Sequence, residues 1–166
     1  MNNKAIRTSE IEVAVAMHFN QRLCLIIPNI SFGFNIHECD LLIVNPNRFL
    51  YEVEIKTSFS DFKADFKKIH QHADRRNRIK GFYYAVPEYL VERVRPLLPE
   101  HAGLIVVESR EFGQRAEVLK RCKYSKTVKP ITDSDLMTLQ RLALLRLWEY
   151  KRVLVKHFFD ITQKIF

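Results

Sequence analysis

The 166-residue sequence predicts one α/β domain in which helices flank a mixed central sheet. Short apolar runs bounded by Pro and Asn are typical of strands. These runs alternate with segments whose apolar residues recur every three or four positions, which is typical of helices. A content of 47% hydrophobic and 28% charged residues is ordinary for a folded globular chain. Because no linker or internal repeat divides the chain, we expect residues 1–166 to form a single domain.

The first elements are predicted from capping, turn and strand signals. Ser9-Glu10-Ile11-Glu12 has the S-x-x-E form of a capping box, with Glu12 as the capping acid, and predicts a helix to about Gln21. An apolar run ended by Pro28-Asn29 predicts a strand. The hairpin that follows turns at Asn45-Pro46-Asn47. The three predicted strands of this half are Leu23 to Ile27, Cys39 to Val44 and Phe49 to Lys56.

After Lys56 the apolar period changes from two to about three and a half, which predicts a helix. Its apolar face holds Phe59, Phe62, Phe66, Ile69 and Ala73. The remaining predicted elements are a strand at Gly81 to Val86, a short helix at Tyr89 to Leu98, a strand at Ala102 to Val107, a basic strand and loop at Arg115 to Lys129, and a long helix from Ser134 to about Asp160. The predicted core spans about residues 9–110, with residues 111–166 added to it.

The long helix carries an apolar stripe from Leu136 to Phe158. The stripe is suited either to cover the sheet or to pair with a second copy, so a homodimer is one predicted arrangement. We expect Trp148 in this helix to pack rather than to stack on bases.

The charge balance favours a polyanionic partner such as nucleic acid, or an anionic surface. Lys and Arg total 27 against 19 Asp and Glu, a net charge of +8. The 4 glycines and the lack of either phosphate-binding glycine motif argue against nucleotide-triphosphate and dinucleotide chemistry. The 3 scattered cysteines predict a reducing compartment. No stretch approaches the roughly 20 apolar residues that span a bilayer, so we expect a cytoplasmic protein with no membrane partner.

Three charged side chains on the second hairpin strand are the candidates for chemistry. Glu52, Glu54 and Lys56 alternate with apolar residues and therefore share one face. Antiparallel pairing across the turn brings Asp40 of the partner strand beside Glu54. Two carboxylates held together repel, and a divalent cation such as Mg²⁺ relieves that repulsion. With Lys56 next to it, the pattern favours phosphodiester hydrolysis, although the spacing D-x13-E-x-K is permissive.

These residues resemble the PD-(D/E)XK nuclease superfamily, whose signature is an Asp on one hairpin strand and (D/E)-x-K on the next. Asp40 matches the first position and Glu54-Ile55-Lys56 the second, with Cys39 in place of the proline. Longer stretches are similar to the MmcB-like DNA-repair family and to related phage and mobile-element proteins. They are Ser60 to Lys68, Phe82 to Pro87 and Pro99 to Val107, whereas His37 to Leu41 is similar to a stretch of several small housekeeping members of the superfamily.

The resemblance implies a restriction-endonuclease-like fold and a set of site residues. It implies a Mg²⁺ or Mn²⁺ site built from Asp40, Glu54 and the main-chain carbonyl of Ile55, with Lys56 as the catalytic lysine. Glu12 matches the glutamate that the superfamily often places on its first helix, better than Glu10 does, while its predicted capping role needs no metal. The helix after Lys56 is implied to supply nucleic-acid contacts, for which the candidates are Lys68, His70, His72, Arg75 and Arg76.

The predicted function is a metal-dependent nuclease acting on DNA, in DNA repair or recombination or in phage and mobile-element processing; RNA stays open as a substrate. The alternative is a DNA-binding accessory protein that keeps the nuclease fold without catalysis. A third reading is an unrelated α/β protein in which the D…E-x-K pattern is a coincidence.

Overall fold

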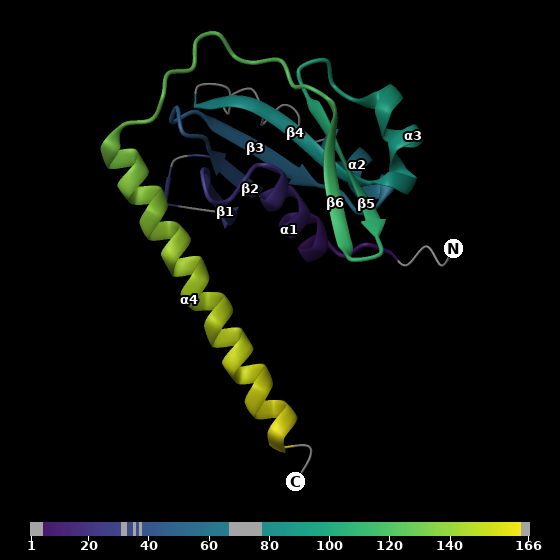
Figure 1. The fold of residues 1–166 in the computed structure, drawn as a ribbon. Helices are drawn as coiled ribbons and strands as arrows, with labels where there is room; N and C mark the ends of the chain where they lie inside the picture. Colours follow the sequence, from purple (N-terminus) through teal and green to yellow (C-terminus); the bar gives the residue numbers. More distant parts are fainter. Residues whose placement is uncertain (1–4, 31–32, 35, 37, 67–77, 164–166) are drawn as a thin grey trace.

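The computed structural model describes residues 5–30, 33–34, 36, 38–66 and 78–163, and in these ranges it has the predicted α/β architecture (Figure 1). Six strands form one sheet in the order β1-β2-β3-β4-β5-β6. The strands are β1 (Leu25–Ile30), β2 (Cys39–Val44), β3 (Leu50–Ile55), β4 (Ile79–Pro87), β5 (Gly103–Arg110) and β6 (Gly113–Lys120). The helices are α1 (Thr8–His18), α2 (Phe59–Phe66), α3 (Val91–Val94) between two 3₁₀ turns, and α4 (Asp133–Gln163).

The sheet is mixed, as the sequence predicts. β3, β4 and β5 run parallel to one another, and every other neighbouring pair is antiparallel. α2 follows β3 directly, so the connection from β3 to β4 starts at the carboxyl end of β3. This end of β3 is where Glu54 and Lys56 lie. The basic strand after residue 111 is β6, which forms the edge of the sheet beyond β5.

The first helix begins earlier than the capping motif predicts. Arg7 is the N-cap residue, and its main-chain N–H donates to the Glu10 carboxylate over 2.7 Å. Glu10 therefore fills the position that the prediction gave to Glu12, and the predicted box opened by Ser9 is wrong. α1 ends at His18, before Gln21, and Asn20 follows in the left-handed region with φ of 59°. Glu12 is thereby one turn inside the helix and takes no part in the cap.

The first strand extends past its predicted end. Pro28 lies inside β1 opposite Leu41, although Pro28-Asn29 was predicted to end the strand. β1 is an edge strand, and there a proline does not remove a hydrogen bond that a central strand needs. The position of the strand in the sheet therefore outweighs the local turn signal.

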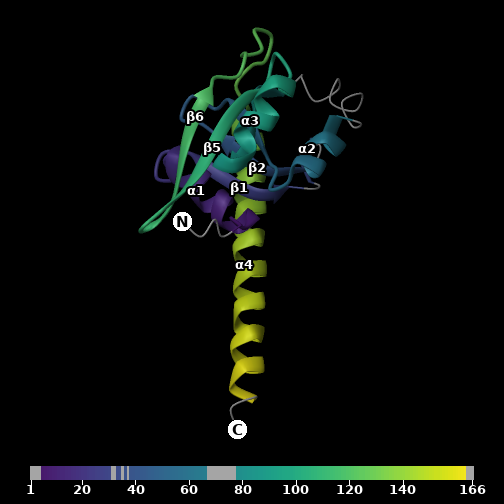
Figure 2. The ribbon, with the colours of Figure 1, turned by 90° about the vertical axis from the view of Figure 1, so that its right-hand side faces the viewer.

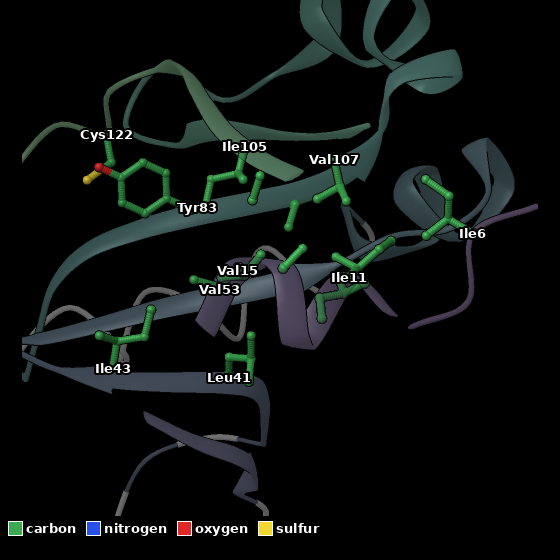
Figure 3. Packing of buried hydrophobic residues seen from close by; sticks show 14 residues of the cluster. Ile6, Ile11, Val15, Leu41, Ile43, Val53, Tyr83, Ile105, Val107 and Cys122 are labelled. Atoms are coloured by element: carbon green, nitrogen blue, oxygen red, sulfur yellow. The ribbon is translucent and has the colours of Figure 1, made fainter. Parts of the chain in front are cut away.

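One face of the sheet is apolar from β2 to β6 and is covered by α1. Ile11 and Val15 of α1 pack against strand residues that include Leu41, Val53 and Ile105 (Figure 3). All five side chains are at most 2% exposed. Burial of this size is the main favourable term in folding, so this face anchors the strands.

The opposite face has two separate apolar clusters with charged residues between them. At one end, Leu42 and Leu50 pack against Leu139 of α4. At the other, Tyr84 and Leu104 pack against Phe62 of α2. β3 crosses from one cluster to the other, and its side chains on this face change from Leu50 to Glu52 and Glu54. The charged residues that are predicted to carry the chemistry therefore lie between the two apolar clusters.

α4 has two dissimilar halves. Near its start, Leu139 is fully buried and the helix packs along β1, while the later half extends away from the sheet (Figures 1 and 2). In the later half Leu147, Trp148 and Leu154 are 49%, 63% and 57% exposed. The expectation that Trp148 packs is therefore wrong in this chain, because the sheet ends before the helix reaches it.

Candidate active site at the end of the central hairpin

The hairpin register brings the two predicted carboxylates to the same place. Leu41 pairs with Val53 and Leu42 with Glu52, and the same register continued by one residue sets Asp40 opposite Glu54. Both side chains alternate away from the α1 face. The ladder itself changes at this point, because the Ile55 N–H donates to Asp40 Oδ2 over 2.7 Å instead of to a strand carbonyl.

The geometry also bears on the predicted main-chain ligand. In an antiparallel ladder the N–H and C=O of one residue point to the same neighbour. Since the Ile55 N–H is directed to Asp40, the Ile55 carbonyl faces the same side of β3. The arrangement fits the ligand role implied for this carbonyl.

Lys56 lies next to Glu54 and is almost completely buried. Its ammonium Nζ is 3.0 Å from Glu54 Oε2 and 3.3 Å from Asp65 Oδ1, and the residue is 6% exposed. Its main-chain N–H donates to the Ala85 carbonyl of β4. The backbone of Lys56 is thus fixed by the sheet, and its side chain bridges the sheet and α2.

Burial and mutual repulsion shift the pKa values of these groups. Burial and then the charge of Asp40 raise the pKa of Glu54 to about 7. Burial raises the pKa of Asp40, against the opposing effects of the Ile55 N–H and Lys56. Burial lowers the pKa of Lys56, but the charges of Glu54 and Asp65 outweigh it and the net shift is upward. The site therefore holds a charged lysine among carboxyl groups that do not all ionise easily.

Asp65 is a site residue that the sequence analysis did not single out. It is 4% exposed, and the Tyr84 hydroxyl donates to its Oδ2 over 2.7 Å. The available signal was helical spacing, because Asp65 is three residues after Phe62 and so borders the apolar face of α2. Phe62 is fully buried and packs edge-on against Tyr84, with the ring centroids 5.0 Å apart.

The structure separates the two glutamates of α1. Glu10 caps the helix and accepts a hydrogen bond from Gln114 of β6. Glu12 is hydrogen-bonded to Asn29, and its pKa is raised by burial and by the negative charge of Asp40. Glu12 is therefore the one of the two whose pKa responds to the charge of Asp40.

Two basic parts of the chain bear on nucleic-acid binding. Lys68, His70, His72, Arg75 and Arg76 lie outside the described residues. The basic stretch after β6 runs across the amino ends of β3 and β4. There the Ser125 N–H donates to the main-chain carbonyl of Lys80, and the Ile131 N–H donates to the main-chain carbonyl of Arg48. This stretch is at the opposite end of β3 from Glu54, so it does not line the carboxylate site.

The donor set fits a hard divalent cation better than a transition metal. Within the described ranges no three His, Cys, Asp or Glu side chains gather as a metal site. Mg²⁺ needs only one or two protein carboxylates and keeps several waters. Asp40 and Glu54 supply that pair, and burial is the main cause that raises the pKa of each, with the charge of Asp40 adding to it at Glu54. The residues present therefore fit Mg²⁺ or Mn²⁺.

Comparison with known proteins identifies the family. A family model described as "DNA repair protein MmcB-like" matches residues 4–152, which include the whole hairpin and α2. The chain belongs to the MmcB-like family. Membership confirms the family resemblance read from the sequence, while the wider nuclease superfamily stays a prediction. No match was found among curated proteins.

A solved structure supports the fold of this MmcB-like chain. The chain is similar to the SPO1766 protein of unknown function from Silicibacter pomeroyi, with a TM-score of 0.62 and 17% identity over 93% of each chain. At this identity the similarity shows the fold alone. Among the helices of the described ranges, none is long and apolar enough to cross a membrane.

Proposed function

We propose that this MmcB-like chain is a metal-dependent nuclease that hydrolyses DNA phosphodiester bonds in DNA repair. One observation carries the proposal: the hairpin sets Asp40 opposite Glu54, with the buried ammonium of Lys56 3.0 Å from Glu54. The family description supports DNA as the polymer, and the net charge of +8 favours a polyanion. RNA is the control substrate.

Asp40, Glu54 and the Ile55 carbonyl would hold Mg²⁺ or Mn²⁺. When bound, the cation supplies charge for the phosphate and a more acidic water. Lys56 places a fixed positive charge next to the two carboxylates, where it neutralises charge that develops on a phosphodiester under attack. Glu12 adds a carboxylate on the Asp40 side of the site. We retain Lys68, His70, His72, Arg75 and Arg76 as proposed phosphate contacts.

A cleavage assay with two variants tests the proposal. Purified protein is incubated with Mg²⁺ or Mn²⁺ and with linear, single-stranded and branched DNA, and with matching RNA. Lys56→Ala should lower the cleavage rate by about 10²–10³, typical of losing one transition-state charge, and leave DNA binding intact. Glu54→Gln should weaken cation affinity, because a neutral amide replaces a charged ligand. Equal cleavage rates for wild type and Lys56→Ala would refute the role of Lys56.

A non-catalytic DNA-binding accessory protein is the second candidate. It is favoured by the pairing of Lys56 with Glu54 and Asp65, which satisfies the charge of the buried ammonium without a cation. Calorimetry separates the two candidates, since a binding module has no need of a Mg²⁺ site. DNA binding without any cation binding, and without cleavage of the substrate panel, would support the accessory role.

A further inference from the structure

Lys56 has two carboxylate partners that come from different layers of the fold. Glu54 comes from the same strand and Asp65 from α2, and their oxygens are 3.0 and 3.3 Å from Nζ. All three residues are at most 8% exposed. A buried ammonium needs partners for its charge, and two carboxylates provide more than neutrality requires. The second partner therefore calls for an explanation.

Asp65 is itself held from a second direction. Its Oδ1 faces Lys56 and its Oδ2 accepts the Tyr84 hydroxyl over 2.7 Å. Tyr84 is 1% exposed and belongs to β4, next to Glu54 in the sheet register. Burial and the hydrogen bond to Asp65 raise the pKa of Tyr84, so the hydroxyl stays a donor. With both oxygens engaged, Asp65 is suited to hold Lys56 and is poorly placed to bind a cation.

Glu54 has two competing uses in the proposed nuclease. It is hydrogen-bonded to Lys56 in this structure, and it is a proposed ligand of the cation. A cation bound by the Glu54 carboxylate polarises its oxygens and so weakens the hydrogen bond between Glu54 and Lys56. Without a second partner the ammonium would either follow Glu54 and compete with the cation, or leave the site. Asp65 removes this conflict because its carboxylate stays with Lys56.

We propose that Asp65 is the positioning residue that keeps Lys56 in the site while Glu54 binds the cation, and that Tyr84 fixes Asp65 for this task. The inference rests on the proposed function, because it assumes that Glu54 takes part in cation binding. Asp61, on the same helix, is exposed and forms no ion pair with Lys56 within the described part of the chain, yet its charge also acts on Lys56. Asp61→Asn is therefore a matched control for loss of charge alone.

The test follows the Lys56 ammonium and the cation affinity, with Asp65→Asn as the main variant. NMR of ¹⁵N-lysine protein detects an ammonium group whose hydrogens are protected by hydrogen bonds. In wild type and in Asp61→Asn, the Lys56 signal should persist when Mg²⁺ is added. In Asp65→Asn, Mg²⁺ should remove it, and calorimetry should show Mn²⁺ affinity about tenfold weaker, because Lys56 then competes for Glu54.

A double variant shows whether the effect passes through Lys56. In Lys56→Ala protein, adding Asp65→Asn should no longer change Mn²⁺ affinity. Tyr84→Phe keeps the charge of Asp65 and should weaken Mn²⁺ binding by a smaller factor than Asp65→Asn does. If Asp65→Asn does not fold, Tyr84→Phe tests the proposal in its place. The proposal is overturned if Asp65→Asn behaves like Asp61→Asn, or if its effect persists without Lys56. Cation binding without cleavage by wild type refutes only the proposed function, whereas no cation binding refutes both.

Discussion

The two faces of the sheet use the same strands for different purposes. On the face covered by α1, β2 and β3 contribute Leu41, Ile43, Val53 and Ile55 to one continuous apolar cluster. On the other face the alternate residues of the same strands include Asp40 and Glu54, between two separate clusters. Because neighbouring residues in a strand point to opposite faces, a well-packed face fixes the backbone that positions the charged one. Stability and chemistry are therefore separable at adjacent positions.

The largest expected effect compares Leu41 with its neighbour Asp40. Leu41→Ala should lower the free energy of unfolding by about 2–5 kcal/mol, because it leaves a cavity under α1. Asp40→Asn should change it little and should weaken Mg²⁺ binding instead. Chemical denaturation and calorimetry on both variants measure the two effects. Similar unfolding losses in the two variants would contradict the division between the faces.

The pH dependence of stability should come from the charged face. The pKa of Glu54 is raised from 4.5 to about 7 in the folded protein. Between these values the folded state binds more protons than the unfolded state, so the free energy of unfolding falls as pH rises from about 4.5 to 7. The raised pKa of Asp40 acts in the same direction. We expect a loss on the order of 1–3 kcal/mol in metal-free protein.

Thermal or denaturant unfolding at several pH values checks this. Glu54→Gln should flatten the profile in the same window, and Mg²⁺ should restore stability above pH 7 in wild type, since the cation replaces the proton. A metal-free profile that rises over this window would contradict the raised pKa of Glu54.

A smaller effect distinguishes the two acids of α1. Glu10→Gln should lower the free energy of unfolding by about 1 kcal/mol, because Glu10 accepts the capping N–H of Arg7. Glu12→Gln should leave stability unchanged or raise it, since burial and Asp40 disfavour its charge. If Glu12 joins the cation site, only Glu12→Gln should weaken Mn²⁺ binding. Weaker binding in both variants would point to general electrostatics.

Local patterns predicted the elements, and long-range packing decided what they could not. Alternation from Tyr51 to Lys56 and the hairpin turn were enough to predict that Asp40 and Glu54 share a face. The capping motif at Ser9 failed because Arg7 and Glu10 form an equivalent cap two residues earlier. The prediction that Pro28 ends its strand was wrong, because a proline is tolerated in an edge strand and only the sheet order shows that β1 is at an edge.

Asp65 shows the limit for the site itself. Its contact with Lys56 depends on how α2 docks, and Phe62 packing against Tyr84 fixes that docking. No spacing rule along the chain contains this information. The same holds for α4, whose apolar stripe looks uniform in sequence although the sheet covers only its first half.

The smallest effect on folding is expected in the extended half of α4, and it tests the predicted homodimer. Leu154 is 57% exposed, whereas Leu139 on the same helix is fully buried. Leu154→Glu should therefore change the free energy of unfolding of the sheet domain by less than about 0.5 kcal/mol, while Leu139→Ala should lower it by about 2–5 kcal/mol. If two copies pair through this half, light scattering should show a dimer in wild type and a monomer in Leu154→Glu. A wild type that is monomeric at all concentrations would refute the dimer and leave the stability comparison intact, because the two halves of α4 differ in what they pack against within one chain.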